Sequence, residues 1–222
     1  MQTKTDAEIH EFRDWVFRYR PGLGAPAHFL LMLHGWTGDE NSMWYFARTI
    51  PEQTAILAPR APYPAPEGGY TWRSVTPGTW GYPTVDDLRP AAEAFLGFVD
   101  GWAHSLGLDP HPFDLVGFSQ GAALSYVITI LHPKLVRTLT ALSGFMPGGA
   151  DGLMMPNLLE GKPVFVAHGR QDDMVPVEKA HRSVDLLEKS GALVTYCESD
   201  GGHKVSRECL KGMELFFKNK FN

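Results

Sequence analysis

Residues 113–131, FDLVGFSQGAALSYVITIL, decide the fold of this chain. The first half of this stretch is apolar, has the length of a strand and ends in glycine. The second half, from Leu124 to Leu131, has apolar residues at i, i+3, i+4 and i+7, the spacing of one buried helix face. Between the halves stands GFSQG (117–121), which leaves no residues for a loop. The sequence therefore predicts a strand that turns directly into a helix.

The residue at this corner is Ser119. An abrupt turn forces the corner residue into a strained backbone conformation, and flanking glycines leave the room that side chains would deny. Ser119 is then held at the C-terminal edge of the strand, above the positive N-terminus of the helix. A bare GxSxG pattern also occurs by chance, so the strand and the helix around it carry the argument. We therefore predict that Ser119 is a nucleophile.

The composition excludes several classes of function. The 222 residues are 44% apolar and 20% charged, ordinary values for a globular protein with a full-sized core. The formal charge is −5 and no lysine or arginine cluster occurs, so we expect neither nucleic acid nor an anionic membrane as partner. The polar, acidic N-terminus and the lack of a long apolar run predict no signal peptide, no membrane insertion and a cytoplasmic location. Cys197 and Cys209 form neither a disulfide framework nor a metal-like pair, and we expect both to be reduced thiols.

Apolar and amphipathic segments alternate along the rest of the chain. This alternation predicts an α/β protein with a mostly parallel central sheet flanked by helices, in one domain that spans residues 1–222. Residues 59–83 and 145–161 fit no period and are rich in proline and glycine, so we expect loops and no large lid domain. The expected strands are 11–20 (an edge strand), 28–33, 55–58, 136–142, 162–167 and 193–197, and the expected helices are 41–50, 86–106, 177–190 and 206–217.

The loops after parallel strands supply the partners that a serine nucleophile needs. These loops lie together at one edge of the sheet, where ligands bind. A serine hydroxyl requires a base at neutral pH, and that base requires an acid to fix its tautomer. His203, in the turn before the last helix, is the predicted base. Asp172 and Asp173 follow a buried strand, and the spacing from that strand leaves either one as the acid. The chain order of serine, acid and histidine is that of the α/β-hydrolase arrangement.

We also predict an oxyanion hole, which requires two backbone N–H groups aimed at the developing negative charge. The N–H group of Gln120, directly after the nucleophile, is one candidate. Trp36, in the loop after the strand 28–33, is the candidate for the other. His34, at the start of that loop, is predicted to hydrogen-bond its own loop and not the substrate.

Aromatic residues and methionines in the irregular segments are the predicted substrate-binding residues. Trp72 and Trp80 belong to the loop 59–83, which is too irregular to need them for a sheet core, so we expect this loop to form a pocket wall. Met146 lies in the second loop and Met174 follows the acid pair, and both are predicted to add adaptable apolar surface to the pocket.

Four ordered motifs resemble the small carboxylesterase/phospholipase family of α/β-hydrolases, a group that includes the acyl-protein thioesterases. The resemblance covers residues 29–217, and dienelactone hydrolases, a similar group, differ by a cysteine at the corner. The motifs are LLMLHGWTGDE (30–40), GFSQGAALS (117–125), HGRQDDMVP (168–176) and GGH (201–203).

The resemblance implies a role for specific residues. In the family pattern the acid is the fourth residue after the motif histidine, which selects Asp172 over Asp173. The oxyanion donors of the family correspond to the backbone of Trp36 and Gln120. The thioesterases usually have HGLGD where this chain has HGWTGD, and the bulky Trp36 at the pocket mouth disfavours a groove for a long acyl chain.

The sequence as a whole predicts a serine carboxylesterase that hydrolyses small, short-chain esters through an acyl-enzyme, without a metal or another cofactor. Two alternatives use the same three residues, namely an acyl thioesterase and a lysophospholipase. A third alternative is a hydrolase fold that only binds a ligand. The presence of Ser119, Asp172 and His203 together argues against it, because a binding protein does not need all three.

Overall fold

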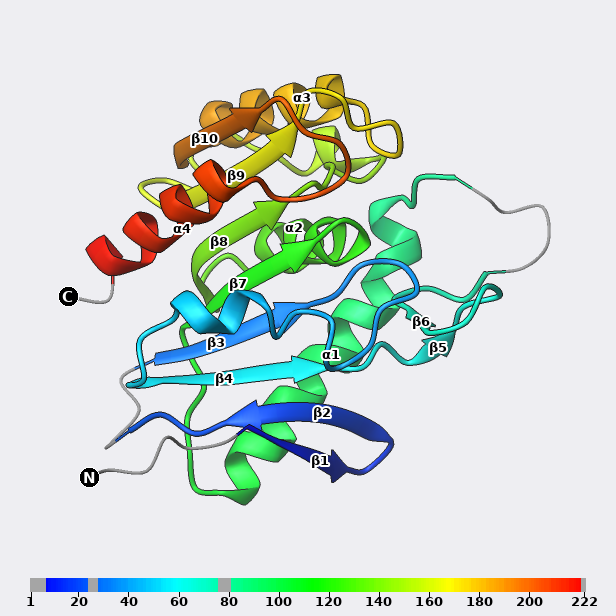
Figure 1. The fold of residues 1–222 in the computed structure, drawn as a ribbon, viewed down its shortest axis with the longest axis vertical. Helices are drawn as coiled ribbons and strands as arrows, with labels where there is room; N and C mark the ends of the chain where they lie inside the picture. Colours follow the sequence, from blue (N-terminus) through cyan, green and yellow to red (C-terminus); the bar gives the residue numbers. More distant parts are fainter. Residues whose placement is uncertain (1–6, 24–27, 76–80, 221–222) are drawn as a thin grey trace.

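The computed structural model of the protein describes residues 7–23, 28–75 and 81–220 (Figure 1). Eight strands form the main sheet: β1 (Glu8–Phe12), β2 (Trp15–Arg20), β3 (His28–Leu33), β4 (Thr54–Pro59), β7 (Phe113–Phe118), β8 (Val136–Leu142), β9 (Pro163–Gly169) and β10 (Leu193–Ser199). Their order across the sheet is β1-β2-β4-β3-β7-β8-β9-β10. From β4 to β10 in this order, adjacent strands are parallel, whereas β2 is antiparallel to both of its neighbours, β1 and β4. The predicted α/β class with a mostly parallel sheet is confirmed.

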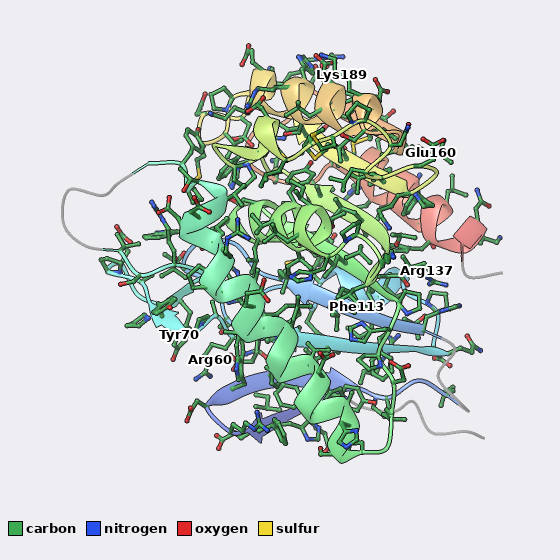
Figure 2. All side chains as sticks on the ribbon, turned by 180° about the vertical axis from the view of Figure 1, so that it is seen from behind. Arg60, Tyr70, Phe113, Arg137, Glu160 and Lys189 are labelled. Carbon is green, nitrogen blue, oxygen red and sulfur yellow. A yellow bond between two sulfur atoms is a disulfide. The ribbon has the colours of Figure 1, made fainter. Side chains whose placement is uncertain are left out.

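Helices cover both faces of this sheet. One face is covered by α1, α2 and α3, and Figure 2 views the molecule from that side, with α1 and α2 in front of the strands. The other face is covered by α4 and the short η1 segment (Figure 1). Among the helices of the described ranges, none is long and apolar enough to cross a membrane. The helical segments are η1 (Phe46–Thr49), α1 (Val85–Ser105), α2 (Gln120–Leu131), η2 (Ala150–Gly152), α3 (Val177–Lys189) and α4 (Arg207–Lys220).

The central strand β3 shows why a continuous apolar run is needed at this place. Side chains of a strand alternate between its two faces. Phe29, Leu31 and Leu33 belong to the core under α1 and α2. Leu30 and Met32 belong to the second core, under α4 and η1. Because both faces are covered, every position from Phe29 to Leu33 is buried and a polar side chain would be costly at any of them.

Two of the expected elements are wrong in detail. Residues 11–20 are not one edge strand, because Arg13 has a φ of 53° and turns the chain into the β1–β2 hairpin. The edge is therefore β1, and β2 pairs with β4. Residues 41–50 form turns and the short η1, since the Asp39 carboxylate accepts hydrogen bonds from the N–H groups of Asn41 and Ser42. Such local side-chain bonds compete with a regular helix.

The two cysteines correct a further expectation. Cys197 of β10 and Cys209 of α4 are joined by a disulfide, with their Cα atoms 5.6 Å apart. They are not the reduced thiols that their number and spacing indicated. The pair comes together because the chain leaves β10, makes one loop and returns along the sheet as α4, an arrangement that has no signature in the cysteine spacing itself.

Candidate active site

The corner between β7 and α2 has the strained geometry that GFSQG predicts. Ser119 has φ 53° and ψ −116°, a backbone conformation that residues other than glycine rarely adopt. A Cβ atom on Gly117 would lie 2.4 Å from the carbonyl oxygen of Gly121. A Cβ atom on Gly121 would lie 2.1 Å from the carbonyl oxygen of Leu33 in β3. Both glycines are therefore required for the helix to begin directly against the sheet.

Ser119 meets the two other predicted residues at this edge of the sheet. The Nε2 atom of His203 lies 3.0 Å from Oγ of Ser119. The Nδ1 atom of His203 lies 2.8 Å from Oδ2 of Asp172. A neutral imidazole with its proton on Nδ1 satisfies both contacts, because Nδ1–H then donates to the carboxylate and Nε2 accepts from the hydroxyl.

The structure also distinguishes the two adjacent carboxylates. Asp172 is 5% exposed, and its Oδ1 atom accepts hydrogen bonds from the N–H groups of Met174 (3.0 Å) and Val175 (2.8 Å). Asp173 is exposed. His168 lies behind the site, where Nε2 donates to the carbonyl oxygen of Val175 at 2.7 Å. Burial lowers the pKa of His168, which keeps this histidine neutral beside Asp172.

Backbone hydrogen bonds connect the loop that carries Asp172 to the loop that carries His203. The N–H group of Arg170 donates to Ser199, and that of Gln171 donates to Gly201, at 2.8 and 2.9 Å. A Cβ atom on Gly169 would lie 2.2 Å from the carbonyl oxygen of Gly201, so glycine is needed for this close approach. The main chain thus holds the two loops side by side.

Two loops supply backbone N–H groups next to Ser119. Gln120 is the first residue of α2, and the first N–H groups of a helix have no intrahelical acceptor. Trp36 belongs to the loop after β3, which contacts the nucleophile: a Cβ atom on Gly35 would lie 3.2 Å from Cβ of Ser119. Both residues therefore belong to segments that meet at Ser119.

His34 holds the Trp36 loop, as the sequence predicted. Its Nδ1 atom lies 2.7 Å from the carbonyl oxygen of Gly35, and its Nε2 atom accepts from the N–H group of Ala61 at 3.0 Å. Burial lowers the pKa of His34 and keeps it neutral, so that one nitrogen donates and the other accepts.

Trp72 is not a pocket residue. It is fully buried, packs against the ring of His34, and donates from Nε1 to the carbonyl oxygen of His34 at 2.7 Å. The expectation that it lines the substrate pocket is wrong, because the irregular loop folds back and inserts the indole beneath the site. The prediction that Met146 lines the pocket is also wrong. Met146 is 4% exposed, and its N–H group donates to the hydroxyl of Ser183 within the core. Trp80 lies outside the described residues.

A cavity of about 280 Å³ opens directly onto Ser119. Met174, which is 63% exposed, lies in its wall as expected. The loop 59–83 does contribute to the wall as expected, but through Arg73, Gly81, Tyr82 and Pro83 and not through Trp72, whereas Phe145 and Val175 were not predicted. Phe145 follows the C-terminal end of β8, so its place at the ligand-binding edge was the one available signal. The wall consists of Trp36, Arg73, Gly81, Tyr82, Pro83, Ser119, Gln120, Phe145, Met174 and Val175.

The chemistry of this site is that of a hydroxyl, an imidazole and a carboxylate in series, beside two sources of backbone donors. Such a set can activate the hydroxyl and stabilise an oxyanion. Within the described residues, no group of three or more His, Cys, Asp or Glu side chains is placed to hold a metal ion.

The sheet order, the flanking helices and the strand–helix corner define the α/β-hydrolase fold. The crystal structure of the Bacillus cereus carboxylesterase is similar with a TM-score of 0.79 and 21% identity, over 90% of this chain and 92% of that one. A structure of YahD with malic acid gives a TM-score of 0.77 and 22% identity, over 93% and 98% of the two chains. At these identities the two structures establish the fold alone.

The model of the family described as Phospholipase/Carboxylesterase matches residues 22–220, and the chain belongs to this family of esterase-type hydrolases. Acyl-protein thioesterase 1 of Kluyveromyces lactis is 29% identical over 184 residues, which are 75% of this chain and 79% of that protein. Carboxylesterase SOBER1 of Arabidopsis thaliana is 28% identical over 116 residues, 51% of each chain.

Proposed function

We propose that this hydrolase is a serine carboxylesterase in which Ser119 is the nucleophile, His203 the general base and Asp172 the acid that orients His203. The observation that carries the proposal is the series of hydrogen bonds from Ser119 Oγ to His203 (3.0 Å) and from His203 to Asp172 (2.8 Å). In this proposal residues 1–222 act as one domain that requires no cofactor.

The proposed reaction has two halves. Oγ of Ser119 attacks the ester carbonyl carbon while its proton passes to Nε2 of His203, and Asp172 stabilises the resulting imidazolium. The N–H groups of Gln120 and Trp36 stabilise the oxyanion of the tetrahedral intermediate. When that intermediate collapses, the carbon–oxygen bond to the alcohol breaks and His203 returns its proton to the leaving oxygen. Water then attacks the acyl-enzyme with His203 as base, which releases the acid and restores the serine.

The cavity beside Ser119 supports short-chain esters as the substrates. Its volume is about 280 Å³. The ring of Tyr82 packs edge-on against Phe145, and the Tyr82 hydroxyl donates to the carbonyl oxygen of Met174 at 2.7 Å. These contacts connect three residues of the cavity wall to one another. A long acyl chain would have to displace this wall. A thioesterase or lysophospholipase with the same residues is the alternative, and the similarity to an acyl-protein thioesterase favours keeping it in the test.

A cytoplasmic location is the accompanying proposal. The Cys197–Cys209 disulfide argues in the other direction, because disulfides persist mainly in oxidising compartments. Fractionation of the source cells, with detection of the protein by an antibody, decides between the two.

Hydrolysis of p-nitrophenyl acetate by the Ser119→Ala variant tests the proposed function. Removal of the nucleophile is expected to lower kcat by about 10⁴-fold or more while the circular dichroism spectrum stays that of the wild type. Ser74→Ala, at an exposed serine outside the cavity wall, is the matched control and should retain full activity. Near-native turnover by Ser119→Ala would refute the assignment, and an inactive wild type that still binds the ester would favour a binding protein.

A further inference from the structure

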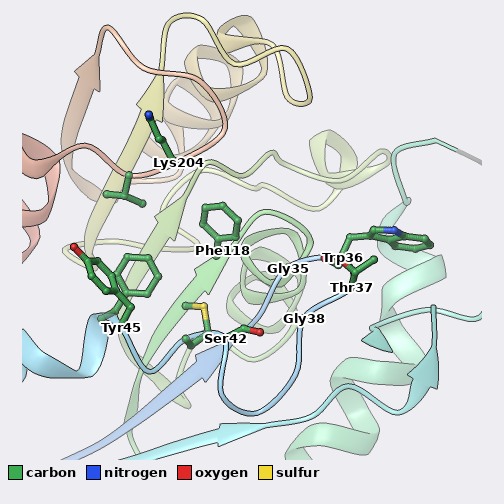
Figure 3. A pocket seen from close by; sticks show the side chains of 11 residues that line it. Gly35, Trp36, Thr37, Gly38, Ser42, Tyr45, Phe118 and Lys204 are labelled. Atoms are coloured by element: carbon green, nitrogen blue, oxygen red, sulfur yellow. Dashed lines mark hydrogen bonds between the residues drawn. The ribbon is translucent and has the colours of Figure 1, made fainter. Parts of the chain in front are cut away.

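A second and larger cavity lies next to the Gly35–Gly38 loop (Figure 3). Its volume is about 550 Å³, and Trp36 is the one wall residue that it shares with the cavity at Ser119. Figure 3 shows Phe118 between the Gly35–Gly38 loop and Lys204, which belongs to the loop of His203. The wall consists of Gly35, Trp36, Thr37, Gly38, Ser42, Met43, Tyr45, Phe46, Phe118, Lys204 and Val205.

Three segments of the cavity wall lie next to Ser119 or His203 in sequence or in space. Phe118 directly precedes Ser119, and its ring centroid lies 5.1 Å from that of His203. Lys204 and Val205 directly follow His203. Gly35 is close enough to the nucleophile that an added Cβ atom would lie 3.2 Å from Cβ of Ser119. Ser119 and His203 are not wall residues themselves, but the residues next to them in sequence, Phe118 and Lys204, line this cavity.

We propose that this larger cavity is a leaving-group subsite, which binds the alcohol part of the ester, and that the smaller cavity binds the acyl part. This inference rests on the proposed function. When the carbon–oxygen bond breaks, Nε2 of His203 must give its proton to the alcohol oxygen, so the alcohol departs on the side of His203. The residues after His203 line the larger cavity, whereas Ser119 and the oxyanion donor Gln120 line the smaller one.

The walls of the leaving-group subsite indicate the class of alcohol. Met43 and Phe46 form a buried apolar floor, and the half-buried Phe118 adds an aromatic ring. Tyr45 is 58% exposed and forms an open aromatic side on which a planar group can stack. The substrates that fit both cavities are esters of short acids with bulky, aromatic alcohols. The acyl chain of such a substrate is the smaller of its two parts.

The test compares two selectivity ratios in two variants. The alcohol ratio is kcat/KM for 2-naphthyl acetate divided by that for methyl acetate, and the acyl ratio is kcat/KM for phenyl butyrate divided by that for phenyl acetate. Intrinsic differences in reactivity between esters cancel when a variant is compared with the wild type. Tyr45→Ala should lower the alcohol ratio about fivefold and leave the acyl ratio within about twofold, because in this proposal the alcohol is the one part of the substrate that the lost ring would contact. Tyr82→Ala, in the smaller cavity, is the matched control and should change the acyl ratio instead.

A change in the acyl ratio with Tyr45→Ala would reverse the assignment of the two cavities, and no change in either ratio would refute the subsite. Tyr45 is exposed, so its truncation should not impair folding. Ser119→Ala, assayed with the same esters, distinguishes a failure of the subsite from a failure of the proposed function. If Ser119→Ala abolishes hydrolysis while Tyr45→Ala changes neither ratio, the proposed function stands and the subsite is refuted.

An independent observation concerns the Cys197–Cys209 disulfide. The bond connects β10 to the first turn of α4, and His203 lies in the loop between them. The hydrogen bonds from the acid loop reach Ser199 and Gly201, both before His203. The disulfide adds a connection from the part of the chain after His203, through Cys209, which is 1% exposed and packs in the core under α4.

From this arrangement we infer that Cys197 and Cys209 are positioning residues for His203, again on the basis of the proposed function. Gly201 and Gly202 give the loop many alternative conformations, and the covalent bond restricts where its two ends can lie. Reduction by dithiothreitol supplies two electrons and two protons: the S–S bond breaks, two thiols form, and the reagent closes to its cyclic disulfide. The imidazole would then spend less time at hydrogen-bonding distance from Ser119.

The expected result is a loss in kcat and not in KM. Well below the Tm, both the reduced wild type and the Cys197→Ser/Cys209→Ser variant should lose about tenfold in kcat, with KM within about twofold. The double variant should not respond further to dithiothreitol, which controls for other effects of the reagent. A purely structural bond would lower the Tm and leave kcat at that temperature unchanged, and this outcome would refute the inference. Two titratable thiols in the untreated protein would refute it as well.

Discussion

The Nδ1 atom of His203 lies 2.8 Å from Oδ2 of Asp172, a carboxylate whose side chain is completely buried. The other oxygen of that carboxylate is held by the N–H groups of Met174 and Val175. The carboxylate therefore has a fixed orientation, and it can fix the tautomer of the imidazole in turn. The exposed neighbour Asp173 has no such place in the site.

This relationship predicts opposite results for two adjacent substitutions. Asp172→Asn should lower kcat by about 10⁴-fold, because an amide no longer favours the imidazole tautomer that accepts the serine proton. Asp173→Asn should retain activity within about twofold, as expected for a surface substitution. Hydrolysis of p-nitrophenyl acetate measures both. Equal losses, or a larger loss for Asp173→Asn, would contradict the assignment of the acid.

Trp72→Ala is expected to affect stability and not specificity. Truncation of a fully buried tryptophan costs about 3–5 kcal/mol of the free energy of unfolding. Trp72→Phe is a more conservative variant that keeps most of the apolar surface but removes the indole N–H that donates to the carbonyl oxygen of His34. It should lower the free energy of unfolding by about 1–3 kcal/mol. Urea unfolding gives these values. A near-native free energy of unfolding together with an altered acyl preference would instead make Trp72 a pocket residue.

The size of the smaller cavity predicts a preference for short acyl chains. Each methylene buried against the wall adds about 0.8 kcal/mol until the wall ends. In a cavity of about 280 Å³, kcat/KM should therefore rise over the first few acyl carbons and then level off or fall. A series of p-nitrophenyl esters from two to sixteen carbons measures this profile. A maximum at twelve carbons or more, or a jump in rate above the micelle concentration, would favour the phospholipase alternative.

Two buried histidines predict a loss of stability in mild acid. Burial lowers the pKa of His34 and of His168 from the usual 6.5, so the folded protein keeps both neutral. Well above pH 6.5 both are neutral in the folded and in the unfolded chain, and they add no pH dependence. As the pH falls below 6.5, the unfolded chain binds protons that the folded protein does not, and the free energy of unfolding decreases. The Tm should therefore be lower at about pH 5 than at about pH 7.5.

A variant locates the source of this acid sensitivity. Asp39 and Asp87 have pKa values lowered from 3.8, so their contributions are lost only in stronger acid. His168→Gln should reduce the decrease in Tm between the two pH values, whereas His104→Gln, at an exposed histidine of α1, should not. A Tm that is the same at both pH values would contradict this account.

The parts of the site that were predictable from sequence are those fixed by local constraints. The corner at Ser119 depends on Gly117 and Gly121, which stand two residues on either side of it, so a short pattern contains the whole requirement. The spacing from the strand alone left Asp172 and Asp173 equivalent, and the family pattern chose the one that the structure brings to His203.

Other features depend on contacts between distant segments. The burial of Trp72 depends on how the chain from β4 to Trp72 folds back onto His34, and no local period encodes that path. The disulfide depends on α4 returning beside β10. The β1–β2 hairpin turns at Arg13 without a glycine or proline to mark it, so two short strands resembled one. The burial of Trp72 and the disulfide thus depend on tertiary contacts, which a local pattern does not contain.

Labelling with a fluorophosphonate tests the central claim most directly, namely that His203 and Asp172 activate Ser119. The reagent bonds covalently to an activated serine hydroxyl, and peptide mapping by mass spectrometry identifies the modified residue. The account predicts one label, on Ser119, in the wild type, no label in Ser119→Ala and strongly slowed labelling in Asp172→Asn. An unlabelled wild type, or a label on another serine with Ser119 unmodified, would contradict it.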